Sequence, residues 1–237
     1  MFQFVNLVSL AAGDLLAFLH PPLLPDRSSG PDINAAHHLN SFTKIALLKV
    51  ESTGGFTMHK VLVLLAQGCE EIEAITIIDI LRRAGIEVTS AGLDDLPVLS
   101  SHGVVLLPDT TLDIAQHQNF DMIVLPGGLP GTDNLRADNR LIALLQKMAQ
   151  QGKYVAAICA APSVLAAAGL LDGRKATCYP TCLDAYPKVN LQNAAVVEDG
   201  KLITSRGPGT AMDFALALAE RLSGKNKRQE VEAALVR

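Results

Sequence analysis

Apolar and polar residues follow the pattern of an α/β domain from residue 59 onward. Short apolar runs, of the kind buried on both faces of a parallel sheet, recur between amphipathic segments. The runs predict strands at residues 61–66, 87–91, 121–125 and 154–158, a hairpin strand within 100–107 and a hairpin over 196–204. The amphipathic segments predict helices at residues 70–84, 139–151, 161–168 and 210–222. This alternation predicts a mostly parallel sheet with helices on both faces.

The candidate chemistry follows directly after three of the predicted strands. Residues 68–73 come after the first strand, residues 126–128 after a later one, and Cys159 after the strand at residues 154–158. Ligands of open α/β sheets bind beyond the carboxyl ends of the strands. We therefore expect a functional site at this edge of the sheet.

Residues 1–57 differ in character from the rest. The apolar stretch over residues 2–19 contains Asp14 and no preceding Lys or Arg, unlike a secretory signal, and its length is marginal for a membrane span. A proline-rich linker follows, and Met58 directly precedes the first predicted strand. We predict a domain boundary here, between an N-terminal extension over residues 1–57, disordered or not natively translated, and one domain over residues 58–237. A targeting role for the extension stays open.

Composition narrows the class of protein. Hydrophobic residues make up 49% and charged residues 19% of the 237 residues, which suits a folded domain. The net charge is −4 without a long basic run, so we expect no sequence-specific nucleic-acid binding, and no membrane association. The four cysteines form no CxxC pair and lack a histidine cluster, so we expect no metal site and read them as reduced thiols of a cytoplasmic protein.

Cys159 lies where a predicted strand meets a predicted helix. This is the nucleophile-elbow arrangement, a tight turn that projects the side chain above the sheet edge. Ala157, Ala160 and Ala161 supply the small neighbours that such a turn needs. Free N–H groups and the dipole at a helix N-terminus favour a thiolate, so we expect the pKa of Cys159 to fall below that of free cysteine. The alternative interpretation is a small buried core residue.

Two further features belong to the same edge of the sheet. The N–H groups of Gly127 and Gly128 suit an anion or oxyanion pocket, although a glycine pair alone is typical of a simple turn. Glu70, Glu71 and Glu73 open the first predicted helix. A carboxyl beside a thiolate would have its pKa raised and could donate a hydrogen bond to the sulfur. The alternative role of these glutamates is helix capping, which suits Glu70 and Glu71. The residues alone do not decide which glutamate faces the cysteine.

Four stretches in the same order resemble the ThiJ/PfpI family, in the branch of parkinsonism-associated protein deglycases and their bacterial YajL-type relatives. The stretches are GCEEIEAITIIDILRRAGIEVT, FDMIVLPGG, VAAICAAP and LITSRGPGTAMDFALAL, and the resemblance covers residues 58 to about 236. The resemblance implies a flavodoxin-like sandwich and a homodimer. It agrees with the strand–helix alternation.

The resemblance also assigns roles to residues. It implies that Cys159 is the nucleophile and Glu73 the carboxylic acid beside it. It implies that the backbone at Gly128 and Ala160 supplies donors to an oxyanion or substrate pocket, to which Gly127 and Tyr179 also belong. Arg206 and Pro208, in SRGPGT, match residues that reach the pocket from a partner subunit in the family.

Three positions depart from the family pattern. Tyr179 occupies the place where members credited with glyoxalase activity often carry histidine, so a cysteine–histidine pair is not evident and Glu73 alone would do the acid–base work. Ala160 follows the cysteine where the protease-like branch has histidine, which argues against a peptidase. His102 replaces a basic residue, which leaves anion binding there in doubt.

Two functions of different classes follow. As an enzyme, a glyoxalase or deglycase, the Cys159 thiolate would attack methylglyoxal, glyoxal or their adducts on proteins and nucleotides, with Glu73 as general acid and base and no metal or organic cofactor. Alternatively, peroxide would oxidise Cys159 in a stress-responsive redox sensor or chaperone, and Glu73 with backbone N–H groups would stabilise the new charge. The same pocket suits both functions, and the sequence leaves the choice open.

Overall fold

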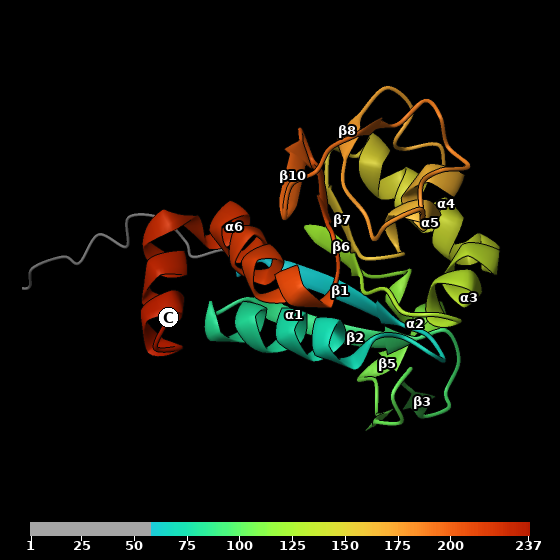
Figure 1. Ribbon diagram of the computed structural model, residues 1–237. Coiled ribbons are helices and arrows are strands. Elements are labelled where there is room, and N and C mark those ends of the chain that lie inside the picture. Colours follow the sequence, from blue (N-terminus) through green and yellow to red (C-terminus); the bar gives the residue numbers. More distant parts are fainter. Residues whose placement is uncertain (1–57) are drawn as a thin grey trace, which may run out of the picture. The chain divides into compact units, whose positions relative to one another are not determined.

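A seven-stranded sheet forms the centre of the protein (Figure 1). The computed structural model describes residues 58–237, so the predicted extension over residues 1–57 lies outside the described part. The strand order is β10-β11-β7-β6-β1-β2-β5, and every neighbouring pair is parallel except β10 with β11. The strands are β1 (Lys60–Leu65), β2 (Glu87–Gly92), β5 (Thr110–Thr111), β6 (Met122–Leu125), β7 (Tyr154–Ile158), β10 (Val196–Asp199) and β11 (Leu202–Ser205).

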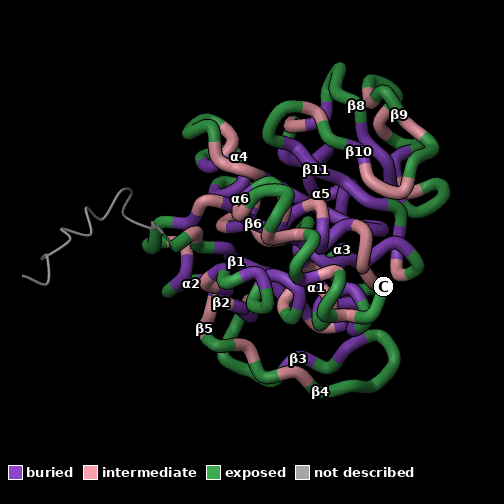
Figure 2. The backbone as a smooth tube through the Cα atoms, turned by 90° about the vertical axis from the view of Figure 1, so that its left-hand side faces the viewer, coloured by how far each residue is buried: buried purple, intermediate pink, exposed green. Residues whose placement is uncertain are grey.

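Helices cover both faces of this sheet, as the sequence pattern predicts. The helices are α1 (Glu71–Arg83), α2 (Leu112–Ala115), α3 (Gly131–Ala137), α4 (Asn139–Gln150), α5 (Pro162–Ala167) and α6 (Ala211–Ala234). Successive residues of β1 point to opposite faces: Val61 and Val63 pack with α1 and α6, whereas Leu62 and Leu64 pack with α4 and α5. Figure 2 shows these strands buried through the centre of the molecule. The chain therefore has two hydrophobic cores, one on each side of the sheet.

Helix α1 begins and ends where the sequence predicts. The Glu70 side chain caps it by accepting a hydrogen bond from the Glu73 N–H at 2.7 Å. Acidic residues occupy its first turn, and Arg82 and Arg83 its last, which complements the helix dipole. This capping fixes the first turn of α1 against the carboxyl end of β1, at the edge where the candidate site lies.

Helix α6 differs from the prediction of a helix over residues 210–222. Its first part breaks at Gly224, whose φ of 84° and ψ of 165° are not helical, and helical structure then resumes to Ala234. The helix is interrupted at Gly224, where the sequence predicts its end, but it does not end there. Val231 in the second part is buried in the same core as Leu222, which explains why the helix continues.

The short elements were the hardest to predict. The strand expected within residues 100–107 is one arm of a small hairpin of β3 (Val98–Leu99) and β4 (Val105–Leu106). Helix α3, the helix α2 and the two-residue pair β8 (Lys175–Ala176) and β9 (Asn190–Leu191) had no clear sequence signal. Across residues 58–237, no helix is both long and apolar enough to cross a membrane.

Candidate functional site

Cys159 sits on a tight turn between β7 and α5, in the predicted elbow. Its φ of 65° is left-handed, which costs a non-glycine residue on the order of 1–3 kcal/mol. Two hydrogen bonds hold this conformation: the Cys159 N–H donates to the Ser205 carbonyl at 2.9 Å, and the Cys159 carbonyl accepts from the Tyr179 N–H at 2.8 Å. The residue is only 8% exposed. The neighbouring strand β11 and the loop after β8 thus fix the position of the thiol.

Glu73 reaches the same point from the first turn of α1. Its side chain is fully buried, and its Oε2 accepts a hydrogen bond from the Gly127 N–H at 2.7 Å. Its Oε1 is also buried and has no hydrogen-bond partner among the described residues. Gly127 has no side chain because a Cβ there would lie 2.6 Å from the Cys159 Cβ and 3.0 Å from Glu73 Oε2. The absence of this Cβ lets the carboxyl and the thiol approach each other.

Burial raises the pKa of the Glu73 carboxyl to about 7. Burial, followed by the charge of an ionised Glu73, also raises the pKa of the Cys159 thiol to about 12, although the backbone N–H groups of Gly128 and Ala160 hydrogen-bond the sulfur and lower it. The expectation that the helix N-terminus lowers this pKa is therefore wrong while Glu73 is ionised. Helix α5 has only six residues, and desolvation outweighs its dipole.

The two groups share one proton when the site carries a single negative charge. On sulfur, that charge faces the N–H groups of both Gly128 and Ala160. On Glu73 it faces only the N–H of Gly127, and Oε1 is left without a donor. A proton on Oε1 removes the repulsion between the groups and gives that oxygen an O–H to direct at sulfur. The pKa values of about 7 for Glu73 and about 12 for Cys159 assign the first negative charge to the carboxylate, whereas the N–H donors at sulfur favour the Cys159 thiolate beside a protonated Glu73 that the function proposed below requires.

A hollow of about 300 Å³ lies at the rim of this pair. Tyr179, Arg206 and Pro208, which the resemblance assigns to the pocket, all line it, together with Gly207. A Cβ on Gly207 would lie 3.9 Å from the Cys159 Sγ and 3.3 Å from the Tyr179 ring, so this glycine joins the hollow to the thiol. Gly207 belongs to the SRGPGT stretch but is not among the predicted site residues. The assignment of Arg206 and Pro208 to a partner subunit stays a prediction.

The structure separates the three glutamates by role. Glu70 caps α1, and Glu71 accepts hydrogen bonds from the His102 N–H and the Ser101 hydroxyl, each at 3.1 Å. Of the three, only Glu73 raises the pKa of the Cys159 thiol, through its negative charge. The geometry therefore agrees with the choice that the resemblance makes, while the role of each residue in chemistry stays a proposal.

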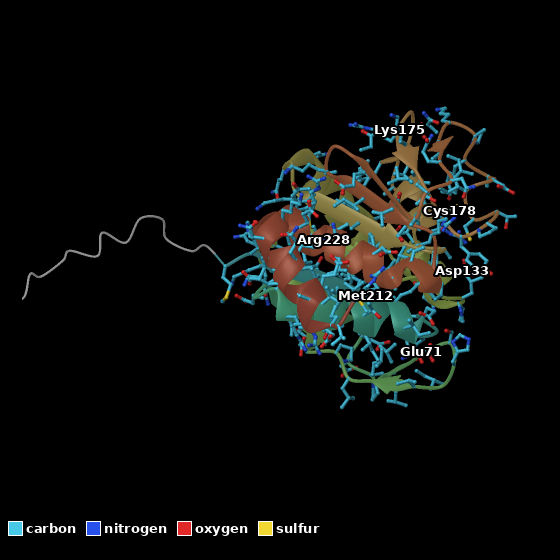
Figure 3. All side chains as sticks on the ribbon, turned by 60° about the vertical axis from the view of Figure 1, so that its left-hand side comes forward. Glu71, Asp133, Lys175, Cys178, Met212 and Arg228 are labelled. Carbon is cyan, nitrogen blue, oxygen red and sulfur yellow. The ribbon has the colours of Figure 1, made fainter. Side chains whose placement is uncertain are left out.

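The other cysteines are Cys69, Cys178 and Cys182, all of them free thiols. Figure 3 shows Cys178 on the same side of the molecule as Glu71 and Asp133. Burial raises the pKa of Cys69 and that of Cys178 to about 11, in the same direction as that of Cys159, and each of the two is packed in a hydrophobic core beside the sheet. This agrees with their interpretation as packing residues.

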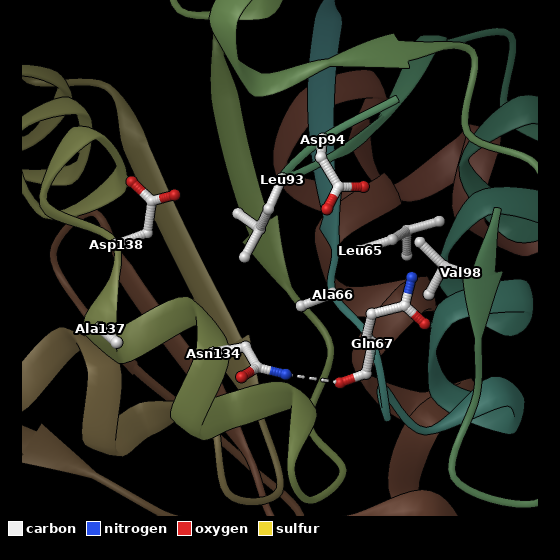
Figure 4. Close-up of a pocket in the computed structure, with 9 residues that line it drawn as sticks. All are labelled: Leu65, Ala66, Gln67, Leu93, Asp94, Val98, Asn134, Ala137 and Asp138. Carbon is white, nitrogen blue, oxygen red and sulfur yellow. Dashed lines mark hydrogen bonds between the residues drawn. The ribbon is translucent and has the colours of Figure 1, made fainter. Parts of the chain in front are cut away.

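A larger hollow of about 400 Å³ lies at the carboxyl ends of β1 and β2 (Figure 4). None of the predicted site residues lines it. Its polar groups already bond to the protein: the Asn134 amide donates to the Gln67 carbonyl at 2.9 Å, and Gln67 bonds to the backbone of Pro97 and Leu99. The chemistry of this edge is therefore concentrated at Glu73 and Cys159.

Comparison with known proteins places this arrangement in a family. The model of the DJ-1/PfpI family matches residues 59–221. Protein dj-1beta of Drosophila melanogaster is 47% identical over 180 residues, covering 74% of this chain and 95% of that protein. The glutathione-independent glyoxalase DJR-1.2 of Caenorhabditis elegans is 38% identical over 164 residues, covering 68% and 87%. The solved structure of oxidized Toxoplasma gondii DJ-1 matches with a TM-score of 0.73 and 42% identity, over 75% of this chain and 98% of that one.

The raised pKa of Glu73 predicts a pH-dependent stability. Because its folded pKa of about 7 exceeds the ordinary 4.5, its contribution is fully present below pH 4.5 and is lost as the pH rises toward 7. We expect the free energy of unfolding of the wild type, relative to Glu73→Gln, to fall by about 2–3 kcal/mol over this range. Urea denaturation of both proteins at several pH values measures it. If the free energies of unfolding of the two proteins changed equally with pH, the pKa of the Glu73 carboxyl would not be raised in the folded protein.

Proposed function

The chain belongs to the DJ-1/PfpI family, and on that premise we propose that it is a cysteine-dependent glyoxalase and deglycase. Its substrates are methylglyoxal or glyoxal and the adducts that these aldehydes form on proteins and nucleotides. Cys159 is the nucleophile, Glu73 is the general acid and base, and neither a metal ion nor an organic cofactor takes part in the reaction. The glyoxalase named in Caenorhabditis elegans supports an activity of this class in the family.

The observation that carries the proposal is the buried pair of a thiol and a carboxyl with an unpartnered oxygen. A structural glutamate would have both oxygens hydrogen-bonded, because an unsatisfied buried acceptor costs about 1–3 kcal/mol. Glu73 Oε1 lacks a partner and lies against a cysteine whose backbone is strained. Strain and unsatisfied polar groups of this kind cluster at active sites.

The first step is attack of the Cys159 thiolate on the aldehyde carbon of methylglyoxal. A C–S bond forms, and the carbonyl oxygen takes the proton of Glu73, which leaves a neutral hemithioacetal and a Glu73 carboxylate. We expect the N–H groups of Gly128 and Ala160, which lower the pKa of the thiol, to stabilise the developing oxyanion as well.

The second step moves a hydrogen between adjacent carbons. Glu73 takes the proton from the carbon bonded to sulfur and returns a proton to the neighbouring carbon, so that the adduct becomes a thioester of lactate. Water then cleaves the C–S bond and releases lactate, and the pair regains one proton. One methylglyoxal and one water give one lactic acid, with no external oxidant or reductant.

A second candidate is a redox sensor or chaperone controlled by oxidation of Cys159. Peroxide would transfer an oxygen atom to the thiolate, giving sulfenate and then sulfinate, with water as the other product. A solved structure of the relative from Toxoplasma gondii is of the oxidized protein, and the N–H donors around the sulfur suit an oxyacid as well as an oxyanion. This candidate uses the same thiolate without a carbonyl substrate.

We also propose that two copies of the chain form a homodimer through α1 and the β3–β4 hairpin. Ile72 and Ile75 on α1, and Leu99 and Val105 on the hairpin, are each about half exposed or more. The contacts of Glu71 with the hairpin turn hold the two elements together, and we propose that these four side chains form one apolar surface.

The dimer proposal predicts that a charge on this surface gives monomers. Val105→Arg would bury a guanidinium without a partner in the interface, so we expect a monomeric mass by light scattering. Leu191→Arg is the matched control, since Leu191 is equally exposed but lies on β9. A dimeric Val105→Arg protein, or a monomeric wild type, would contradict the proposal.

The enzyme proposal predicts multiple turnovers that need both groups of the pair. We expect residues 58–237 to convert methylglyoxal to lactate, and Cys159→Ala and Glu73→Ala to lose at least about a hundredfold in rate, since each removes the nucleophile or the proton carrier. Loss of methylglyoxal and formation of lactate are followed together. Denatured protein is the control for the reaction of the aldehyde with free thiols. Tyr179→His tests whether the histidine that family members credited with glyoxalase activity often carry at this position changes the rate.

The outcome separates the two candidates. Consumption that stops near one aldehyde per thiol, without lactate, contradicts the enzyme and favours the redox sensor. In that case the informative measurement is mass spectrometry of the peptide that contains Cys159 after peroxide treatment, in the wild type and in Glu73→Ala.

A further inference from the structure

Cys178 and Cys182 form a CxxxC pair that the proposed reaction leaves unused. They lie in the loop between β8 and β9, and both are free thiols. Cys178 is buried in the hydrophobic core on the α4 and α5 side of the sheet, and Cys182 packs against the same core. Cys69 and Cys159 belong to the core on the other face of the sheet. Within one chain, Cys178 and Cys182 are therefore each other's thiol neighbours.

A tight turn brings the two ends of this motif together. The Cys182 N–H donates to the Tyr179 carbonyl at 3.1 Å, which closes a four-residue turn. Pro180 is the second residue of this turn and Thr181, with a φ of 71°, is the third, which is the pattern of a type II turn. The left-handed φ is strained for a β-branched residue. The chain reverses between Cys178 and Cys182, so their side chains enter the same core.

The Cys178 sulfur lies against the backbone of Cys182. Burial raises the pKa of the Cys178 thiol and the negative charge of an ionised Cys182 raises it further, whereas hydrogen bonds from the N–H groups of Leu183 and Cys182 lower it. The Cys182 nitrogen is bonded to the Cα that carries the Cys182 side chain. We therefore expect rotation of the two side chains to bring the sulfurs to the disulfide bonding distance of about 2.05 Å.

We propose that Cys178 and Cys182 are a site of reversible oxidation, at which hydrogen peroxide joins the two sulfurs in a disulfide. Peroxide first transfers an oxygen atom to one sulfur, which gives a sulfenic acid and one water. The second sulfur then attacks the first, so the S–S bond forms, the S–O bond breaks and a second water leaves. The two thiols lose two hydrogens and two electrons in total, and a dithiol reductant returns them. The site is separate from Cys159 and does not depend on the proposed function.

Cys182 is the sulfur that peroxide would reach first. It is partly exposed, whereas Cys178 is buried and would act as the second, attacking thiol. Burial and then the charge of Asp184 raise the pKa of Cys182, and the positive charge of Arg136 on α3 opposes them. Both thiols are therefore mostly protonated at neutral pH. Because the thiolate is the reactive form, we expect the disulfide to form slowly at neutral pH and faster as the pH rises.

The turn also contacts the elbow that carries the reacting thiol. Tyr179, which lies between the two cysteines, donates its N–H to the Cys159 carbonyl at 2.8 Å and lines the hollow beside that thiol. A disulfide between Cys178 and Cys182 would enclose Tyr179 in a small ring. The modification would thus restrict a residue that borders Cys159.

Peptide mass spectrometry of the full-length chain with Cys159→Ala tests the proposal without interference from oxidation of Cys159. The reduced protein is treated with hydrogen peroxide at mildly alkaline pH, alkylated with iodoacetamide in denaturant and digested with trypsin. Trypsin cuts after Lys175 and Lys188, so one peptide carries both cysteines. We expect this peptide to lose two hydrogens and to take up no alkyl group. After dithiothreitol it should take up two.

Two variants in the same background locate the bond. Cys182→Ser removes the partly exposed sulfur and should give no peptide that lacks two hydrogens, while circular dichroism checks that the protein stays folded. Cys69→Ala is the matched control, because it removes a thiol from the other core and should leave disulfide formation unchanged. The proposal is overturned if both cysteines of the peptide remain open to alkylation, if they form sulfinic acid instead, or if the bond links either of them to Cys69 or to a second chain.

Discussion

The close approach of the Glu73 carboxyl to the Cys159 thiol is the constraint on which the site depends. Neither group is exposed, so water cannot screen them and each controls the protonation of the other. The approach is possible only because residue 127 is glycine: any Cβ there would collide with the cysteine. The proposed mechanism places the one negative charge of this pair on sulfur, beside the N–H groups of Gly128 and Ala160.

The fold brings these groups together from separate parts of the chain. Helix α1 after β1 carries Glu73, the loop after β6 carries Gly127 and Gly128, and the turn after β7 carries Cys159. These three strands are neighbours at the centre of the parallel sheet, so their carboxyl ends converge. Strand β11 then fixes the turn through Ser205. The strained cysteine and the unpartnered carboxylate oxygen both oppose folding, and the two cores of the sheet compensate for them.

The sequence predicted the architecture and the elbow well, because both depend on local patterns. The runs of β1, β6 and β7 are apolar on both faces, and small residues surround Cys159. Spacing could not reveal that Gly207 lies against the thiol or that His102 meets Glu71, since both contacts are long-range. The sequence also predicted the wrong direction for the pKa shift of the Cys159 thiol, because a helix N-terminus can be recognised in a sequence whereas the depth of burial cannot.

The central claim is that the shared proton resides on Glu73 and that the sulfur is the charged atom. The ultraviolet absorbance of the thiolate, taken as the difference from Cys159→Ala, measures this directly at neutral pH in the wild type and in Glu73→Ala. Because Glu73→Ala removes a donor to the charged sulfur, the account predicts a thiolate fraction more than about tenfold lower in the variant. A higher thiolate fraction in Glu73→Ala would contradict it, since Glu73 would then be an ionised neighbour that suppresses the thiolate.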